Sequence, residues 1–412
     1  MRGSKTFGCA SIRLFLIGKT IYAAKYVVMS SVFENGFQKK GINMLPQNIL
    51  VVRLSAIGDV LHCTPVSRAL REQYPDAKLS WIVSDKAQDI LVGNPFLDEV
   101  LVWDKDQWKQ KFAANPFKGY RSLQVLTRTL RQRQFDLVVD VHAQLLPGLI
   151  TWGSGAPIRV GFSNAKEMAS LFYNKKVPRD GSLPITRQYL GSLGALGISA
   201  PQAGMIMPVA PENEQKAAAI WSENNIGDAD KVVVLNSSTT WPTKCWPPEY
   251  FSQLGNYLLQ EQGVKILLTG AKADIPLVQQ IKNGINGEAI DIAGHTGLKD
   301  LAAVIRKCDL FITGDTGPLH MAAAVGTPTL SLFGPTDPRI YAPEGEQHVS
   351  LLSPAPCRLC RKRTCNHFVC MAQIKPELVY QEAVELLRKT AGCRYRNTEL
   401  QYRVAPVKRM PV

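Results

Sequence analysis

Asp59 is the first residue whose type and position suggest chemistry. It ends the segment Ser55-Ala56-Ile57-Gly58-Asp59, which follows an apolar run at 49–54 and precedes a predicted helix. Backbone N–H groups and the helix dipole stabilise a carboxylate at a helix entry, so Asp59 is either a simple cap or a base that accepts a proton from a hydroxyl. The segment contains neither GxGxxG nor GxxxxGK[ST], which argues against a dinucleotide oxidoreductase and a P-loop enzyme.

A second segment, 311–324, predicts an anion-binding site. An apolar run ends in a glycine-bracketed turn, and a helix begins at Gly317, because the proline that follows is favoured in a first helical turn. The N–H groups of Thr316 and Gly317 then suit a diphosphate. Asp315 either caps the helix or binds a sugar hydroxyl, and His320 is either structural or a ligand contact.

The loop after the apolar run 232–235 carries hydroxyl groups and one lysine. Thr239, Thr240 and Lys244 suit phosphate recognition, although the alternative is an ordinary surface loop. After the next strand, the segment from Gly270 to Asp274 is placed to reach a ribose. The segment 293–297, which contains Thr296, is placed to line a base.

Apolar runs of strand length alternate with helical patterns along the chain, which predicts βαβ units and parallel sheets. The expected strands are 49–54, 79–83, 100–103, 135–140, 158–161, 232–235, 265–270, 289–292, 310–313 and 329–333. The expected helices are 60–73, 85–93, 119–133, 187–196, 212–225, 248–262, 298–307, 317–325 and 375–390. The fold class is therefore α/β, with two Rossmann-like, doubly wound domains whose strand-end loops face one another across a cleft.

Composition shifts give the domain boundaries. A stretch rich in proline and glycine at 199–213 reads as a linker, so we expect an N-terminal domain at 44–205 and a C-terminal domain at 206–392. Outside them lie an extension at 1–43 and a basic tail at 393–412. The chain of 412 residues is 45% hydrophobic and 20% charged, which argues against a disordered chain or a multi-span membrane protein.

The net charge of +14 is concentrated at the two ends. The extension carries seven basic residues and one acid, and the tail carries five basic residues and one acid, so ten of the fourteen units lie outside the two domains. The near-balanced body does not require a nucleic-acid partner, and none is expected.

The extension is apolar over 7–29, but its basic residues are six apart and point to different sides of a helix. We interpret it as a dispensable extension or a start codon assigned too far upstream, with a weak membrane-surface anchor as the alternative. Without a convincing secretory signal, the expected location is the cytoplasm.

Nine cysteines are present, and four of them cluster: Cys357, Cys360, Cys365 and Cys370. Four thiols so close together suit a structural zinc ion or an iron–sulfur cluster, with His367 as a spare ligand. Disulfides and free thiols remain alternatives. The spacing fits neither a zinc ribbon nor a ferredoxin, and the basic neighbours Arg358, Arg361, Lys362 and Arg363 would lower the thiol pKa values or meet phosphates on a lipid acceptor.

Together these segments resemble glycosyltransferase family 9, the ADP-heptose:lipopolysaccharide heptosyltransferases of Gram-negative bacteria. The resemblance covers roughly 47–390, and it rests on the order and spacing of several motifs. These are Leu54–His62, Arg159–Phe162, Leu171–Asn174, Lys244–Pro247, Ala293–Leu298, Gly314–His320 and Phe333–Pro338. Many members of this family carry a similar cysteine-rich segment, so the cluster need not mean a separate activity.

The resemblance implies a GT-B fold and an inverting transfer of heptose from ADP-heptose to a hydroxyl of the lipopolysaccharide core, with contact at the cytoplasmic face of the inner membrane. Asp59 would be the general base, and Lys244 with Thr239 and Thr240 would neutralise the departing diphosphate without an obligatory metal. The implied donor-binding residues also include Gly270, Asp274, Thr296, Asp315, Thr316, Gly317 and His320. The implied acceptor-binding residues are Ser55, Gly58, His62 and Gln144.

One segment departs from the family pattern. Members often have Gln-Gly-Leu-x-Lys-Ser after the fourth strand, but this chain has Gln144-Leu145-Leu146-Pro147-Gly148-Leu149 and lacks the lysine. Because this segment faces the acceptor, a different acceptor glycan or sugar nucleotide is an open alternative. A nucleic-acid-binding protein and a non-catalytic nucleotide-sugar sensor are the alternatives from other classes.

Overall fold

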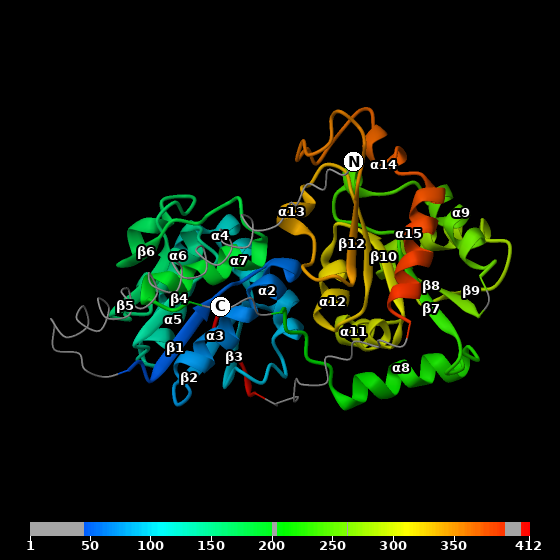
Figure 1. Ribbon diagram of the computed structural model, residues 1–412. Coiled ribbons are helices and arrows are strands. Elements are labelled where there is room, and N and C mark those ends of the chain that lie inside the picture. The colour runs from blue at the N-terminus through cyan, green and yellow to red at the C-terminus, as the bar shows by residue number, and fades with distance from the viewer. Residues whose placement is uncertain (1–44, 200–203, 262, 392–404) are drawn as a thin grey trace, which may run out of the picture.

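The computed structural model describes residues 45–199, 204–261, 263–391 and 405–412. Two α/β domains lie side by side, each with helices packed on its sheet (Figure 1). The predicted architecture of two doubly wound parallel sheets is confirmed. The predicted extension at 1–43 lies outside the described residues. Within the described residues, no helix combines the length and the apolarity needed to cross a bilayer.

The N-terminal domain contains a parallel sheet of seven strands in the order β13-β3-β2-β1-β4-β5-β6. The strands are β1 (Asn48–Val52), β2 (Lys78–Ser84), β3 (Glu99–Trp103), β4 (Leu137–Asp140), β5 (Ile158–Phe162), β6 (Lys175–Val177) and β13 (Val407–Arg409). The helices are α2 (Ile57–Cys63), α3 (Pro65–Gln73), α4 (Lys105–Ala114), α5 (Pro116–Arg131), α6 (Leu145–Gly153) and α7 (Ile185–Leu190), with 3₁₀ turns η1 (Asp85–Ile90), η2 (Ala169–Phe172) and η3 (Gly191–Leu196).

The C-terminal domain contains a parallel sheet of six strands in the order β12-β11-β10-β7-β8-β9. The strands are β7 (Lys231–Asn236), β8 (Val264–Thr269), β9 (Ala289–Asp291), β10 (Leu310–Gly314), β11 (Thr329–Phe333) and β12 (His348–Leu352). The helices are α8 (Pro211–Glu223), α9 (Pro248–Leu258), α10 (Ile275–Asn283), α11 (Leu298–Lys307), α12 (Gly317–Ala324), α13 (Pro338–Tyr341), α14 (Val369–Ala372) and α15 (Pro376–Lys389), with η4 (Pro242–Lys244) and η5 (Lys272–Asp274).

The strand order reverses at one place in each sheet. From β1 the chain proceeds outward to β2 and β3 and then crosses to β4 on the other side of β1. From β7 it proceeds to β8 and β9 and then crosses to β10 on the other side of β7. Loops diverge at such a switch point and leave a crevice beyond the carboxyl ends of the strands.

The central strands are apolar because both faces of each sheet are covered. Val51 of β1 pairs with Trp81 on one side and with Val139 on the other, and all three side chains are fully buried. One continuous cluster of buried side chains extends from the N-terminal domain through α2 to Met321 and Ala322 of α12. The packing of α2 against α12 therefore fixes how the two domains meet (Figure 1).

The single helix predicted over 60–73 is wrong. The structure has two helices there, because Pro65 lacks an N–H and begins α3 after α2 ends at Cys63. The helix predicted at 85–93 is a 3₁₀ turn, η1. Helix α4 was not predicted, and it has no buried residue, so it has no apolar periodicity for the sequence to reveal.

The predicted basic tail is in part a structural element. Strand β13 pairs in parallel with β3, and the Met410 amide donates to the Val102 carbonyl at 2.7 Å. Lys408 forms an ion pair of 2.7 Å with Glu99, whose side chain is buried. Residues 405–412 thus complete the edge of the N-terminal sheet, which the sequence did not indicate because the pairing is with a strand three hundred residues away.

The two sides of β13 give a matched stability test. Met410 is buried, and Met410→Ala should lower the free energy of unfolding by about 2–3 kcal/mol because it leaves a cavity. Val407, at the start of β13, is 42% exposed, and Val407→Ala should cost less than about 0.5 kcal/mol. Denaturant unfolding of both variants checks this, and equal effects would contradict the docking of β13.

Candidate functional site

The loops at the two switch points face each other. In the N-terminal domain, the loop after β1 leads to Asp59, and the loop after β4 leads to Gln144. In the C-terminal domain, Lys244 follows β7 and Asp315 follows β10, which is the neighbouring strand. The backbones of α2 and α12 approach each other closely. A Cβ atom added to Gly58 would lie 3.8 Å from the Cα of Gly317.

A cavity of about 630 Å³ lies beyond the carboxyl end of the N-terminal sheet. Most of its wall comes from the N-terminal domain, and Ile340, Tyr341 and Arg361 of the C-terminal domain close one side. Three of the predicted site residues line it, Ser55, Asp59 and Gln144. The N-terminal switch point is therefore an open cavity rather than a filled turn.

The Asp59 carboxylate lies on the cavity wall, with its side chain 41% exposed. Its Oδ2 lies 2.9 Å from Nη2 of Arg53, and Tyr189 donates its hydroxyl proton to Oδ1 at 3.1 Å. Burial raises the pKa of Asp59, but the Arg53 guanidinium and the Tyr189 hydrogen bond outweigh it, so the pKa lies below its usual range. The group is thus ionised and able to accept a proton at neutral pH.

Of the other residues predicted to bind the acceptor, Ser55 and Gln144 line the cavity, whereas His62 lies outside it. Ser55 accepts a hydrogen bond from Lys105, and Gln144 lies 3.1 Å from Nε2 of His142. The Leu54 amide donates to Nδ1 of His142, so the neutral ring presents its Nε2 proton to Gln144. His62 does not line the cavity and is instead buried at the domain contact.

Sequence reasoning missed the residues that hold Asp59 in place. Arg53 is 5% exposed, donates to the Val141 carbonyl at 3.1 Å, and lies over the Tyr189 ring at 5.0 Å. A second cation, the Arg179 guanidinium, lies 4.6 Å from the centre of the same Tyr189 ring. The available signal was a charged residue that ends an otherwise apolar strand, since such a residue needs a buried partner.

At the C-terminal switch point, Lys244 and Asp315 form a buried ion pair. The Lys244 ammonium donates to Oδ2 of Asp315 at 2.7 Å, and the Thr336 hydroxyl donates to the same oxygen at 2.7 Å. Burial raises the pKa of Asp315, but His320 and Lys244 outweigh it, so the pKa is strongly lowered. Asp315 does not cap α12; Thr316 occupies that position.

Lys244 also contacts an aromatic face. Its Nζ lies 4.3 Å from the Trp241 ring centre, and the Arg363 guanidinium lies 4.9 Å from the same ring. Two cations and the N-terminus of α12 therefore gather at one edge. Open space lies in front of Gly317, because a Cβ built there would meet no atom within 4 Å. Such an arrangement suits a diphosphate.

The remaining predicted donor residues lie on the same edge of the C-terminal sheet, with different local partners. Thr239 donates to the Trp241 carbonyl at 2.7 Å, and Thr240 is exposed. Gly270 and Thr296 follow β8 and β9. Asp274 accepts from the Ala271 amide at 2.8 Å, so its carboxylate caps a turn in this conformation.

His62 and His320 meet at the domain contact. Their rings pack edge to face with centres 4.1 Å apart, and Nε2 of His320 lies 3.9 Å from Oδ1 of Asp315. Both ring nitrogens of His62 and Nδ1 of His320 are buried. None of these three atoms has a hydrogen-bond partner among the described residues. Burial and the neighbouring His320 lower the pKa of His62 well below its usual value, so His62 is neutral.

No disulfide joins the four clustered cysteines, all of which lie among the described residues, and Cys357 and Cys360 are exposed. In the part of the chain that the structure describes, no three His, Cys, Asp or Glu side chains are arranged to hold a metal ion. The metal site therefore stays a prediction. The pKa of the Cys365 thiol is lowered mainly by hydrogen bonds from the backbone N–H groups of His367 and Phe368. The charge of the basic neighbour Lys362 lowers it less than these hydrogen bonds do.

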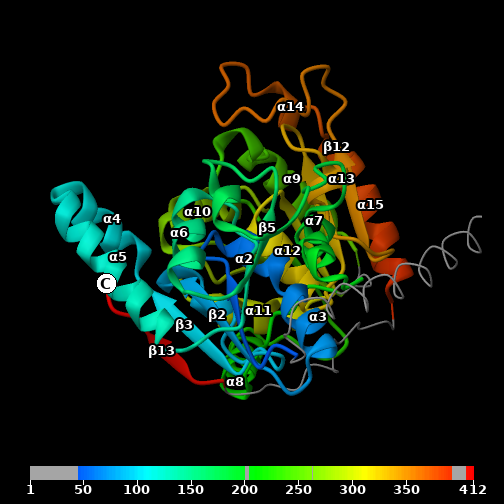
Figure 2. The same cartoon turned by 90° about the vertical axis from the view of Figure 1, so that its left-hand side faces the viewer.

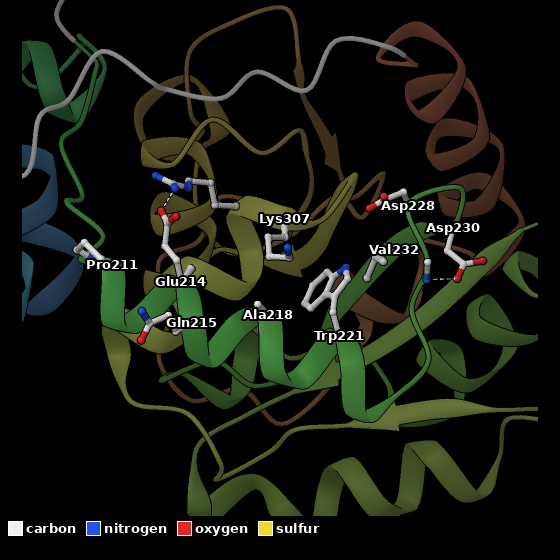
Figure 3. A pocket seen from close by; sticks show the side chains of 12 residues that line it. Pro211, Glu214, Gln215, Ala218, Trp221, Asp228, Asp230, Val232 and Lys307 are labelled. Atoms are coloured by element: carbon white, nitrogen blue, oxygen red, sulfur yellow. Dashed lines mark hydrogen bonds and ion pairs between the residues drawn. The ribbon is translucent and has the colours of Figure 1, made fainter.

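Figure 3 shows a second hollow, of about 520 Å³, in the C-terminal domain. Arg306 pairs with Glu214 at its rim, and Nζ of Lys307 lies 5.3 Å from the Trp221 ring centre. The hollow lies beside α8 and the first residues of β7, at the opposite end of that strand from Lys244. We do not assign it to the site, because ligands of such sheets bind beyond the carboxyl ends.

Known proteins resemble this chain in sequence and in fold. The family model described as glycosyltransferase family 9 (heptosyltransferase) matches residues 123–369. Lipopolysaccharide heptosyltransferase 1 of Pseudomonas aeruginosa is 27% identical over 333 residues, which cover 77% of this chain and 87% of that protein. The crystal structure of a family 9 glycosyltransferase from Veillonella parvula superposes with a TM-score of 0.73 at 25% identity, covering 83% and 97% of the two chains. An Escherichia coli heptosyltransferase with ADP superposes with a TM-score of 0.65 at 23% identity, covering 82% and 99%.

The family match and the two facing parallel-sheet domains identify a glycosyltransferase of the GT-B architecture. The chain belongs to glycosyltransferase family 9, the heptosyltransferases.

The contact between Arg53 and Asp59 predicts a shift that can be measured. Arg53→Met should raise the pKa of the Asp59 carboxyl, because the nearest cation is lost. In the native protein the lowered pKa contributes stability above the usual value of 3.8, and this is lost as the pH falls through the folded-state pKa. Carbon-13 NMR titration of the carboxyl measures the shift.

Two variants control for this titration. Arg53→Lys keeps the charge and should give a smaller rise in the Asp59 pKa. Arg179→Met removes a cation that contacts Tyr189 rather than Asp59, and it should leave the Asp59 pKa nearly unchanged. If Arg53→Met and Arg179→Met had equal effects, Arg53 would not be the group that holds the carboxyl ionised.

Proposed function

We propose that this enzyme transfers heptose from ADP-heptose to a hydroxyl of the lipopolysaccharide core with inversion at the anomeric carbon. The observation that carries the proposal is the placement of an ionised carboxylate, Asp59, opposite a cationic edge formed by Lys244 and the N-terminus of α12. The first group suits the acceptor, and the second suits the leaving group.

On the acceptor side, Asp59 is the general base. An acceptor saccharide in the cavity of about 630 Å³ would present a hydroxyl to the Asp59 carboxylate. The Asp59 pKa is low, so the carboxylate is a weak base in the resting site, but it is fully ionised and receives the proton as the new bond forms. Ser55 and Gln144 line the same cavity and would bind other hydroxyls of the acceptor.

On the donor side, the departing ADP develops negative charge at the bridging oxygen. Lys244 would turn from Asp315 to the diphosphate, and the amides of Thr316 and Gly317 have no acceptor within α12, so they can meet the same anion. Thr239 and Thr240 would contact the phosphates as well, and Asp315 and His320 would hold the sugar. This charge stabilisation calls for no obligatory metal ion.

The reaction is a single displacement. The acceptor oxygen attacks the anomeric carbon from the face opposite the diphosphate, the bond from that carbon to the phosphate oxygen breaks, and the proton passes to Asp59. One displacement inverts the configuration, whereas a retained configuration would need a second nucleophile at the carbon.

The comparisons support the choice of substrates. Relatives are named lipopolysaccharide heptosyltransferases, and a similar Escherichia coli heptosyltransferase was solved with ADP. We therefore expect an ADP-sugar donor, a lipid-linked core acceptor, and work at the cytoplasmic face of the inner membrane. Gly270, Asp274 and Thr296 would contact the nucleoside of such a donor.

Removal of the proposed base tests the mechanism. Asp59→Asn should lower kcat for ADP release with a core-saccharide acceptor by about a hundredfold to ten-thousandfold, because the acceptor hydroxyl loses its proton acceptor. Asp76→Asn, an exposed aspartate far from the cavity, should retain full turnover. Donor binding by calorimetry should be unchanged in both variants, and full activity of Asp59→Asn would refute the role.

A ligand screen tests the donor. Thermal unfolding with ADP-, GDP- and UDP-sugars should show stabilisation by the ADP-sugar, since a ligand at about 100 times its Kd adds about 2.7 kcal/mol to the free energy of unfolding. Lys244→Ala should lose most of this shift, whereas Lys231→Ala, at the opposite end of the same strand, should keep it. A larger shift with a GDP- or UDP-sugar would contradict the ADP-heptose assignment.

A further inference from the structure

One side of the N-terminal domain carries apolar side chains that the fold leaves uncovered. Helices α4, α5 and α6 run along this side, as Figure 2 shows. Exposed apolar residues on α5, on α6 and at the neighbouring turn η2 include Phe117, Tyr120, Val125, Trp152, Met168 and Leu171. Phe117, Trp152 and Leu171 are 65%, 55% and 67% exposed, so these are large side chains and not edges of the core.

These elements form one continuous surface. The ring of Phe172 in η2 packs on α6 at Gly148. Helices α5 and α6 pack so closely that a Cβ atom added to Gly153 would lie 2.3 Å from the Thr127 side chain. Arg131 of α5 donates a hydrogen bond to the Gly153 carbonyl at 2.9 Å. The apolar residues of α5, α6 and η2 therefore share one face, which we call the outer face.

The outer face is also basic. Between residues 107 and 135 the sequence has seven basic residues and no acid. On α5, Lys118, Arg121 and Arg128 are exposed, and no carboxylate among the described residues forms an ion pair with them. The Arg121 guanidinium lies 5.5 Å from the centre of the Phe117 ring, so charge and apolar surface are interleaved.

The outer face adjoins the acceptor cavity. Gln144 and Lys166 line the cavity, and the exposed residues Leu145 and Met168 lie one and two positions further along the chain from them. The Leu145 amide donates to the Glu167 carboxylate at 3.1 Å, which holds the two segments together. A saccharide in the cavity that is attached to lipid would thus have its lipid near this face.

We propose that the outer face is a docking surface for an anionic lipid bilayer. Aromatic and aliphatic side chains would enter the interfacial region while lysine and arginine meet lipid phosphates. Exposed Val, Leu and Met side chains favour a bilayer over a nucleic acid, which is bound by aromatic stacking and phosphate contacts. The proposal rests on the lipid-linked acceptor of the proposed function, and it assigns the surface that presents this acceptor.

Vesicle binding tests the proposal with the full chain and no sugar substrate. Sedimentation with phosphatidylcholine vesicles that contain one third phosphatidylglycerol should capture the protein, and vesicles of phosphatidylcholine alone should capture much less. The pair Lys118→Glu and Arg128→Glu should weaken binding by about tenfold or more. The control pair Lys231→Glu and Arg388→Glu, which makes the same change in net charge on the C-terminal domain, should retain binding.

The apolar contribution has its own pair of variants. Phe117→Ser should weaken vesicle binding by about tenfold, whereas Leu378→Ser, an exposed apolar residue of α15, should not. Equal losses in a test variant and its control, no binding to anionic vesicles, or preferential binding to a single-stranded oligonucleotide would each overturn the docking surface.

A second readout separates the two proposals. Turnover with a water-soluble core saccharide should be unchanged in Lys118→Glu/Arg128→Glu and in Phe117→Ser, since none of these residues lines the cavity. Native binding to anionic vesicles without any turnover would contradict the proposed function and leave the docking surface standing. Turnover without binding to anionic vesicles would overturn the docking surface and leave the proposed function standing.

Discussion

The site depends on one constraint, which is that the strands of each sheet are parallel. Every loop that follows a strand must then emerge at the same edge, and the reversal of strand order opens a crevice there. Asp59 and Gln144 emerge at the reversal between β1 and β4, and Lys244 and Asp315 emerge at the reversal between β7 and β10. The packing of α2 on α12 brings the two edges together, so the Asp59 carboxylate and a cationic edge face one another.

Paired charges keep both edges ready for substrate. Arg53 holds the Asp59 carboxylate ionised, and Asp315 holds the Lys244 ammonium in a pocket where an unpaired charge would be costly. In the proposed function, a diphosphate would replace Asp315 as the partner of Lys244, and an acceptor hydroxyl would meet the Asp59 carboxylate. The same principle does not extend to both nitrogens of His62 and to Nδ1 of His320, which are buried and lack hydrogen-bond partners among the described residues.

Much of the fold and of the candidate site follows from local sequence. Short apolar runs that alternate with helical periods specify parallel strands buried on both faces, and the predicted strands at 49–54, 232–235 and 310–313 are present. The family predicted from the motifs around Asp59, Lys244 and Asp315 is confirmed by the family model, which matches residues 123–369 and so includes the last two of them. Helix α4 could not be predicted, since it buries no residue and so has no apolar period.

The sequence by itself determined the fold class, the family and the residue types at the strand ends, because these depend on local patterns. Only the tertiary structure decided which groups meet: Arg53 and Tyr189 at Asp59, Thr336 at Asp315, and β13 at the edge of the N-terminal sheet. These contacts join residues that are far apart in the chain, and no local period records them. For the same reason His62, which belongs to the same motif as Asp59, lies at the domain contact and not in the cavity.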